Sequence, residues 1–310
     1  MLSGTASELY WLSRYLERAE NTARMLDVAW HLSMIPFSIT ARDEIAATLI
    51  ISGCMEDYEE RYGAVQVHNV LHFFTLDDEN PVSIYNCIRC ARENAHAVRG
   101  RITAEMWESI NSTWIELQEM KQMGLLTIGA SDFFDWVKNR SHLYRGATYG
   151  TIMRNDAFRF LRVGTFVERA DNTARILDVK HQISDVAGNA AVEYYRWSAL
   201  LRSVGAYEAY REIYSDSITT ENVAELLILS AEVPRSLRAC MQMLCELLPA
   251  IEGDAGKNAK RLAAVQYARL QYGDVRHIFD LGLHEFLTDF LRRISELAEE
   301  INREFLEVTK

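Results

Sequence analysis

Hydrophobic residues recur every three or four positions near the start of the chain, with polar residues between them. The series is Leu9, Leu12, Leu16, Ala19, Ala23, Leu26 and Trp30. This spacing follows one face of an α-helix and predicts a long helix whose apolar side packs on a neighbour. A second series with the same spacing is Phe160, Val163, Val167, Ala170, Ala174, Leu177 and His181. The sequence therefore predicts two long helices, each with alanines at the middle of its apolar seam.

The ends of these two helices carry recognisable signals. Thr5 and Glu8 have the spacing of a capping box, so the first helix is expected to begin there. Pro36 is expected to close the same segment. Asn155 or Asp156 is suited to cap the second helix.

The rest of the chain predicts further helices separated by turns that contain Gly or Asp. The expected ranges are 41–62, 64–75, 81–98, 102–123, 131–147, 190–214, 220–230, 234–250, 257–272 and 283–308. Only 4 Pro and 15 Gly occur in 310 residues, fewer turn residues than many short strands would need. We therefore expect an all-α protein built as a multi-helix bundle.

Two segments of the long helices are nearly identical. Residues 16–28 and 167–179 lie 151 positions apart, and ten of their thirteen positions match. The three differences, Leu16/Val167, Glu20/Asp171 and Met25/Ile176, are conservative. A solvated helix face would have diverged, so this repeat indicates a constraint on its polar residues. We expect one domain over residues 1–310, with two internally repeated halves at about 1–150 and 151–310.

Charge and cysteine content narrow the class of protein. The net charge is −11 and the basic residues form no run, which argues against binding to nucleic acid or to an anionic membrane surface. The chain start lacks signal-peptide features, and no apolar run approaches the roughly 20 residues that span a bilayer. Five scattered Cys do not form a disulfide framework, so the expected location is the cytoplasm.

Polar residues of the repeat form a stripe on the helix surface. Glu17, Asn21 and Arg24 are spaced i, i+4 and i+7, with Glu20 and Asp27 on the flank of this stripe. Glu168, Asn172 and Arg175 repeat the spacing. The residues Arg18 and Arg169 lie to one side of the stripes. If the two halves face each other, the two stripes converge on one site.

Two interpretations of this stripe remain open. In the first, it forms a pocket in which Arg holds a carboxylate or phosphate, Asn adds a directional amide, and Glu orients Arg or moves a proton. In the second, it is a buried ion-pair network that fixes helix register. Spacing alone favours the second, and repetition is compatible with both.

Other candidate groups carry weaker signals. His68 and His72 lie at i and i+4 without a third ligand, so no metal site is predicted. Cys87 and Cys90 form a single Cys-x-x-Cys on an expected helix and are read as small core residues. The pair His284-Glu285, like His277, is assigned to packing rather than to a pocket. No phosphate-binding glycine loop or serine elbow is present, and no cofactor is expected.

The opening Leu9-Tyr-Trp-Leu-Ser-Arg-Tyr-Leu-Glu-Arg-Ala-Glu-Asn-Thr-Ala-Arg24 resembles the start of the bacterial alpha-E superfamily, whose members are all-helical and carry a Glu-Arg motif. Further similar segments are Ala91-Arg-Glu-Asn-Ala95, Glu105-Met-Trp-Glu-Ser-Ile-Asn111, Phe166–Arg175, Val233-Pro-Arg-Ser-Leu-Arg238 and Gly282-Leu-His-Glu-Phe286. The family's Glu-Arg motif corresponds to Glu17-Arg18 and Glu168-Arg169. Gly4 and Val233 depart from the family pattern, which expects a basic and an aromatic residue there.

The resemblance implies a context rather than a mechanism. Members of the family are typically encoded beside, or fused to, a circularly permuted ATP-grasp protein and a transglutaminase-like protein, a grouping proposed to make or modify peptides. The preferred hypothesis is a non-catalytic accessory subunit that binds an anionic peptide or the partner enzyme through the Glu-Asn-Arg stripe.

Two rival hypotheses remain. One is an enzyme in which Glu17 or Glu168 acts as acid or base and Arg24 or Arg175 clamps a carboxylate-bearing peptide. The other is an interaction protein in which the motif is structural. The sequence does not decide whether the protein is an enzyme.

Overall fold

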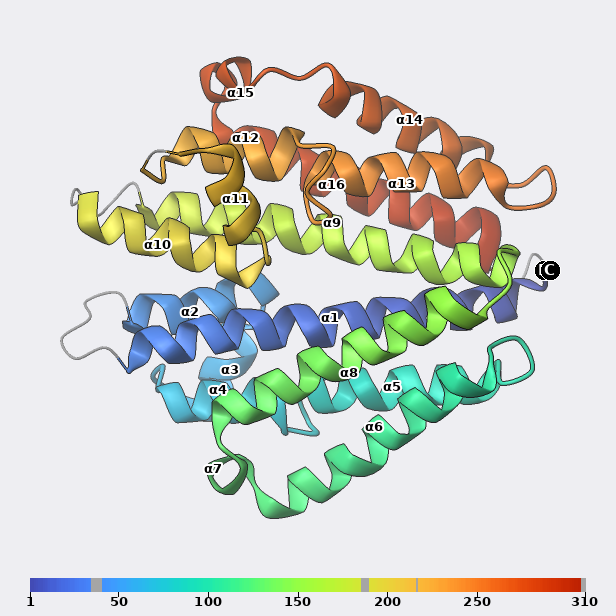
Figure 1. Cartoon of the computed structure of the whole chain (residues 1–310), viewed down its shortest axis with the longest axis horizontal. Helices are drawn as coiled ribbons and strands as arrows, with labels where there is room; N and C mark the ends of the chain where they lie inside the picture. Colours follow the sequence, from blue (N-terminus) through green and yellow to red (C-terminus); the bar gives the residue numbers. More distant parts are fainter. Residues whose placement is uncertain (35–40, 185–189, 216, 308–310) are drawn as a thin grey trace. The chain divides into compact units, whose positions relative to one another are not determined.

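The computed structural model describes residues 1–34, 41–184, 190–215 and 217–307 (Figure 1), and these residues form helices and connecting turns without strands. The all-α prediction is confirmed. The first helices are α1 (Ser3–Ser33), α2 (Ala41–Ser52), α3 (Met55–Tyr62), α4 (Val67–Thr75), α5 (Ile84–Ala97), α6 (Ala104–Met123), α7 (Leu125–Ile128) and α8 (Ala130–Thr151). The later ones are α9 (Asp156–Ser184), α10 (Ala190–Ser203), α11 (Tyr207–Ile213), α12 (Thr220–Leu229), α13 (Leu237–Ala250), α14 (Lys257–Gln271), α15 (Val275–Leu281), α16 (Leu283–Ile301) and the π-helical turn η1 (Asn302–Leu306).

The chain divides into two compact units. The N-terminal unit is Glu8–Gly164, and the C-terminal unit is Met1–Ser7 together with Thr165–Lys310. The N-terminal unit therefore holds most of α1, all of α2 to α8 and the start of α9. The prediction of a single domain over residues 1–310 stays a prediction.

The core of the N-terminal unit lies where α1 meets the helices that follow it. Helix α1 contributes Ala19, Ala23, Leu26 and Ala29 to this core. They belong to one cluster with the aromatic pairs Phe73-Phe74 of α4 and Phe133-Phe134 of α8. Helices α5 and α6 pack on each other, and α6 packs on α8. The predicted apolar seam of α1 is thus the buried side of that helix.

The C-terminal unit has its own core. Its largest fully buried side chains include Trp197 of α10, Tyr210 of α11 and Phe290 of α16. Helix α13 packs on α14, and α14 packs on α16. The predicted apolar positions of α9 in this unit are buried from Val167 to Leu177, and His181 is half-buried. Phe160 and Val163, also buried, belong to the N-terminal unit.

Two predicted helices, 41–62 and 190–214, are each two helices. The break follows Gly53 in the first and Gly205 in the second, where φ is +67° and +64°. In both turns the amide of the residue after glycine donates to a carbonyl five residues earlier, at 2.9 Å from Cys54 and 2.8 Å from Ala206. This is the bonding of a Schellman motif, which ends a helix at a glycine that adopts the left-handed conformation.

The predicted start of the first helix is also wrong, because α1 begins at Ser3 and Thr5 lies inside it. The cap of α9 is found where it was predicted, since the amide of Ala157 donates to Asn155 Oδ1 at 3.0 Å. Pro36 lies outside the described residues. The short helices α7 and α15 were not predicted.

Several structural details recur at a spacing of 152 or 153 residues. Ser83 caps α5 by accepting from Asn86, and Ser236 caps α13 by accepting from Ala239. The hydroxyl of Tyr58 accepts a backbone amide hydrogen bond at 3.2 Å, and so does that of Tyr210. These recurrences favour the predicted repeat of two halves, which stays a prediction.

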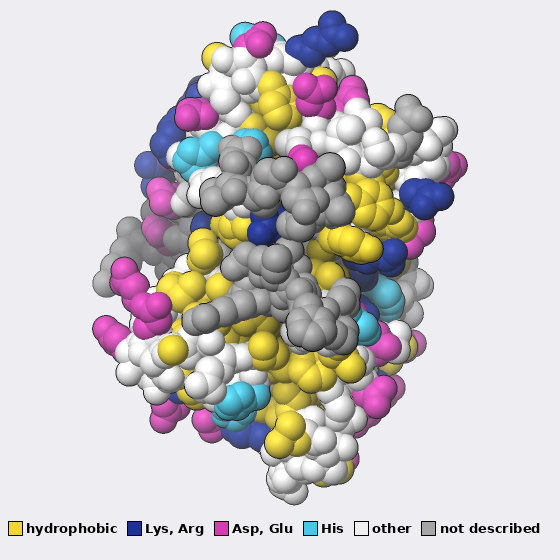
Figure 2. All heavy atoms as spheres, turned by 90° about the vertical axis from the view of Figure 1, so that its left-hand side faces the viewer, with side chains coloured by type: hydrophobic (Ala, Val, Ile, Leu, Met, Phe, Trp, Pro, Cys, Tyr) yellow, Lys and Arg dark blue, Asp and Glu magenta, His cyan; other side chains and the backbone are white. Residues whose placement is uncertain are grey.

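Within the described residues no helix is long and apolar enough to cross a membrane. On the face drawn in Figure 2, lysine and arginine side chains are interspersed with acidic ones instead of forming one basic patch.

Candidate functional site

The first copy of the repeat places its acidic residues in the interior of the N-terminal unit. Glu20 is fully buried, Glu17 is 3% exposed, and Asn21 is also buried. Arg24 is the most exposed member of the stripe, with 19% of its side chain accessible. Such burial requires that the carboxylates be paired, because an isolated charge in a protein interior costs several kcal/mol.

Glu20 receives donors from two helices. Arg24 Nε, one turn further along α1, donates to Glu20 Oε1 at 2.9 Å. From α8, Ser141 Oγ donates to Glu20 Oε2 at 2.6 Å, and Arg145 forms an ion pair with the same oxygen. Arg145 Nη2 also lies 3.5 Å from Glu17 Oε2. We call Glu17, Glu20, Arg24, Ser141 and Arg145 the Glu20 cluster.

The contact between α1 and α8 continues toward the end of α1. Lys138 Nζ donates to Asp27 Oδ2 at 2.8 Å and pairs with Asp135 at 2.7 Å. His142, which is exposed, lies 3.4 Å from Arg24 Nη2. The acidic groups of α1 therefore face cationic groups of α8 along two helical turns. An incoming anion would have to compete with Glu20 for Arg24 and Arg145.

Arg18 lies apart from this cluster. Its guanidinium carbon is 5.9 Å from the centre of the Tyr15 ring, and its side chain is half-buried. This position agrees with the prediction that Arg18 lies to one side of the stripe.

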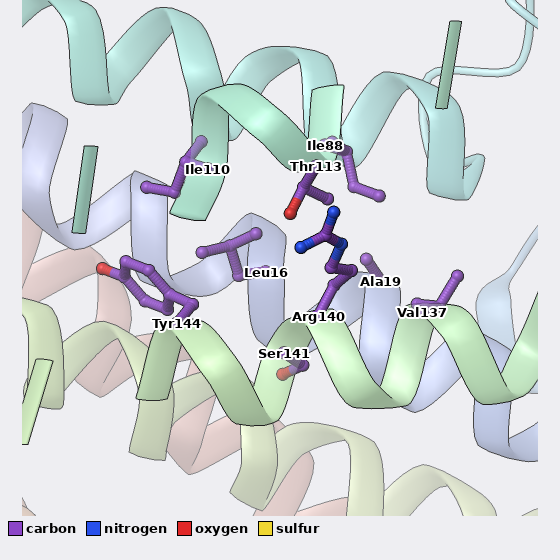
Figure 3. Close-up of a pocket in the computed structure, with 9 residues that line it drawn as sticks. All are labelled: Leu16, Ala19, Ile88, Ile110, Thr113, Val137, Arg140, Ser141 and Tyr144. Atoms are coloured by element: carbon purple, nitrogen blue, oxygen red, sulfur yellow. The ribbon is translucent and has the colours of Figure 1, made fainter. Parts of the chain in front are cut away.

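A small pocket lies beside the Glu20 cluster. It is lined by Leu16, Ala19, Ile88, Ile110, Thr113, Val137, Arg140, Ser141 and Tyr144, and its volume is about 20 Å³. Figure 3 shows Arg140 extending from α8 toward Thr113 of α6. Arg140 is paired with Glu116. Burial lowers the pKa of Arg140. A water needs about 10–15 Å³, so this pocket has room for a water rather than for a peptide.

The second copy of the repeat has a different arrangement. Glu168 and Arg169 are buried, and Arg169 Nη1 donates to the backbone oxygen of Pro234 at 3.3 Å. Arg175 is 47% exposed, and its Nε and Nη2 donate to the two oxygens of Asp171 at 2.8 and 3.2 Å. Asn172 is half-buried. The guanidinium of Arg175 is thus bonded to a residue of its own helix, and nearly half of the side chain faces solvent.

Further along α9, Asp178 contacts α16. His284 Nδ1 lies 2.6 Å from Asp178 Oδ1. The hydrogen bond to Asp178 raises the pKa of His284, so the imidazolium form is favoured there. His284 was assigned to packing, and its partner on α9 could not be read from the sequence.

The described structure brings Glu17, Glu20 and Arg24 together with α8, and it places Arg169 and Arg175 in separate surroundings. Whether the two stripes share one site stays a prediction. Sequence reasoning placed Glu20 at the edge of the stripe and omitted Ser141 and Arg145. A signal was present, because position 20 is acidic in both copies of the repeat, as Asp171 shows.

The weaker candidates have ordinary surroundings. His68 and His72 are exposed on α4, and no group of three or more metal-binding side chains occurs in the part of the chain that the structure describes. Cys87 is buried, and its thiol donates to Val82 O at 3.7 Å. The amide of His277 donates to Asp274 in the cap of α15.

The protein is all-helical in its described residues and carries two Glu-Arg motifs. Comparison with known families identifies the class to which such a chain belongs. A family model named Alpha-E, described as a predicted alpha-helical domain with a conserved ER motif, matches residues 1–306. The chain belongs to the Alpha-E family, as its resemblance predicted.

The chain is also similar to uncharacterized proteins of Mycobacterium bovis and Mycobacterium tuberculosis. Each comparison gives 23% identity over 327 aligned residues, which include 94% of this chain and 34% of the mycobacterial protein. The chain thus spans about a third of the length of these relatives. No solved structure matches it.

Proposed function

We propose that the chain is a non-catalytic, accessory helical module of an ATP-grasp-linked system that makes or modifies peptides. In this proposal the Glu20 cluster stabilises the N-terminal unit, and the second copy of the repeat binds an acidic segment of a peptide or of the partner enzyme through Arg175. The observation that carries the proposal is the contrast between the buried, paired carboxylates of α1 and the half-exposed guanidinium of α9.

The burial of the glutamates supports a non-catalytic role. A general acid or base must reach the proton that it moves, within about 2.6–3.2 Å or through one water. Glu17 and Glu168 are 3% and 5% exposed, and Glu17 faces Arg145. The pocket beside Glu20 is about 20 Å³. These features favour an ion-pair network over a substrate-binding centre in the N-terminal unit.

The lengths of the relatives support an accessory role. In the mycobacterial proteins the matched region is about a third of the whole, so a similar sequence occurs there within a much longer chain. The ATP-grasp partner itself is an expectation from the family resemblance. It enters here only as part of the proposal.

The test is binding to the purified circularly permuted ATP-grasp partner by isothermal titration calorimetry. We expect Arg175→Gln to weaken binding about tenfold, the loss of one well-placed charged contact, while the melting temperature stays nearly unchanged. The matched control is Arg159→Gln, which removes the same charge from the same helix. Like Arg175, Arg159 is paired with an acidic residue of α9, Asp156. Equal affinities for the unmodified chain and both variants would contradict the role of Arg175.

The rival proposals give different results in the same set of experiments. Turnover of a carboxylate-bearing peptide by the isolated chain, lost in Glu17→Gln, would favour an enzyme. Failure to bind the partner, combined with no turnover, would favour a purely structural role of both copies.

A further inference from the structure

Three arginines surround one aspartate on the surface of the C-terminal unit. Arg269 Nη1 of α14 and Arg293 Nε of α16 each donate to Asp289 Oδ2 at 2.8 Å. Arg292 Nη2 donates to the other oxygen, Oδ1, at 2.6 Å. Because Arg269 and Arg293 bind the same oxygen atom, their bonded nitrogens are at most twice 2.8 Å apart. We call Arg269, Arg293 and Asp289 the Asp289 cluster.

The matching position in the N-terminal unit has a different charge pattern. Arg140 and Arg293 each lie ten residues after the first residue of their helices, α8 and α16. Glu116 and Arg269 each lie twelve residues after the starts of α6 and α14. In the N-terminal unit the facing residues are therefore Glu116 and Arg140, an ion pair without net charge. In the C-terminal unit an arginine stands in place of the glutamate.

The arginines keep a net positive charge at this position. Arg292 also pairs with Glu296, so its charge is balanced by that carboxylate. Arg269 and Arg293 then share one negative charge, that of Asp289. Burial raises the pKa of Asp289. The hydrogen bonds from Arg293, Arg269 and Arg292 outweigh this effect and hold the pKa well below its usual range. The arrangement is consequently fixed at neutral pH, in a chain whose net charge is −11.

Donor groups remain at this cluster. Arg293 binds Asp289 through Nε, and neither of its terminal nitrogens contacts an acceptor among the described residues. Arg269 uses Nη1 for both Asp289 and Gln266 Oε1. Side-chain exposure is 35% for Arg293 and 38% for Arg269, so both side chains are partly accessible to solvent. The two terminal nitrogens of an arginine match the two oxygens of a carboxylate.

We propose that Arg269 and Arg293 form a binding site for a carboxylate side chain of an acidic peptide segment. Asp289 holds the two arginines next to each other before binding, which lowers the entropy that binding must overcome. The site lies on exposed side chains of two adjacent helices, which suits an extended segment better than a small molecule, because small ligands require enclosure. This site is distinct from Arg175 and does not depend on the identity of the partner enzyme.

The test uses a fluorescein-labelled hexaglutamate peptide and fluorescence anisotropy, at low ionic strength and at about 0.15 M salt. We expect the double variant Arg269→Gln/Arg293→Gln to lower the affinity about tenfold or more. Arg303→Gln is the matched control, since Arg303 is a surface arginine paired with Glu300 just beyond α16. That control should change the affinity by less than about twofold.

A second variant separates hydrogen-bond geometry from charge. Arg293→Lys keeps the charge and removes the planar fork, so we expect it to lower the affinity several-fold. Circular dichroism melts of all variants should remain close to that of the unmodified chain, since the side chains are exposed. The proposal would be overturned if the double variant lost no affinity. It would also be overturned if the loss of binding free energy in the double variant were no more than twice that in Arg303→Gln. Arg175→Gln leaves this cluster intact, so failure of the proposed function would be seen separately.

Discussion

The two copies of the repeated sequence have different physical environments. On α1, Glu20 is fully buried and accepts hydrogen bonds from Ser141 and Arg145 of a second helix. On α9, the corresponding Asp171 is bonded to Arg175 of its own helix, where Asp171 is half-buried and Arg175 is 47% exposed. Both copies form the same i, i+4 pair of acid and arginine. The same repeated sequence can therefore have different structural roles. The residues of the neighbouring helix determine whether the acid–arginine pair is buried.

The facing helix differs in its polar residues. Lys138, Ser141 and Arg145 repeat at three and four positions on α8, which places them on one side of that helix. On α16, His284 contacts Asp178 and Gln182 of α9 rather than Asp171. An acidic position that meets donors from another helix becomes part of the core. The same position without such donors remains at the surface.

The largest expected difference between the two copies follows from removal of the acid. Glu20→Ala leaves Arg24 and Arg145 without their buried carboxylate, and breaking a buried ion pair costs about 3–5 kcal/mol. Asp171→Ala removes an exposed pair and should cost less than about 1 kcal/mol. Urea unfolding of both variants measures the two free energies. A loss in Glu20→Ala as small as that in Asp171→Ala would remove the distinction.

Removal of the arginine should also destabilise the first copy more than the second, with smaller losses of unfolding free energy than removal of the acid. Glu20 keeps Arg145 and Ser141 in Arg24→Ala, so we expect about 1–3 kcal/mol, the cost of one charged hydrogen bond. Arg175→Ala should stay below about 1 kcal/mol, because Arg175 is 47% exposed. Thermal melts followed by circular dichroism provide the comparison. Equal losses in the two variants would show that exposure of the guanidinium does not separate the copies.

The pair of Asp178 and His284 predicts a pH dependence that belongs to the C-terminal unit. The hydrogen bond to Asp178 raises the folded-state pKa of His284 above its ordinary value of about 6.5. The stabilisation is therefore complete below that ordinary value and is lost as pH rises through the folded-state pKa. The melting temperature difference between the unmodified chain and His284→Gln should shrink from about pH 6 to about pH 8. A difference that is constant with pH would contradict this pairing.

The smallest expected effect concerns one thiol in each unit. Burial, followed by the nearby charges of Asp57 and Glu246, raises the pKa of Cys54 and of Cys245 to about 11. At about pH 8 only about a thousandth of each thiol is then ionised, and the thiolate is the reactive form. Mass spectrometry after iodoacetamide treatment should show slow modification of both residues, and rapid modification in urea. Rapid alkylation of either thiol in the folded protein would contradict the raised pKa of that thiol.

The sequence predicted the helical fold because apolar spacing records which side of each helix is buried. Helix ends were predicted less well, since Gly53 and Gly205 interrupt regions whose hydrophobic pattern continues. The four residues of α7 and the seven of α15 are too few to display a helical period. The hydrophobic pattern therefore identified the long helices and missed the short helices and the turns that end at these glycines.

The candidate site was predicted only in part, for a different reason. The stripe of Glu17 and Arg24 could be placed on one helix from spacing alone. The position of Glu20 between two guanidiniums depends on α8, which lies more than a hundred residues later in the chain. The pairing of Arg169 with the Pro234 carbonyl depends likewise on a distant turn. Contacts between separate helices are set by packing, which spacing within one helix does not encode.

The first copy of the repeat is an internal network that joins α1 to α8, whereas the second is a partly exposed pair within one helix. A double-mutant cycle on Glu20→Gln and Arg145→Gln, measured by urea unfolding, tests this contrast most directly. We expect a coupling of about 1–3 kcal/mol for this pair, because the two residues share one buried network. The parallel cycle on Asp171→Asn and Arg175→Gln should give less than about 0.5 kcal/mol, as expected for an exposed i, i+4 pair. Additive effects at Glu20 and Arg145, or equal coupling in the two copies, would contradict the account.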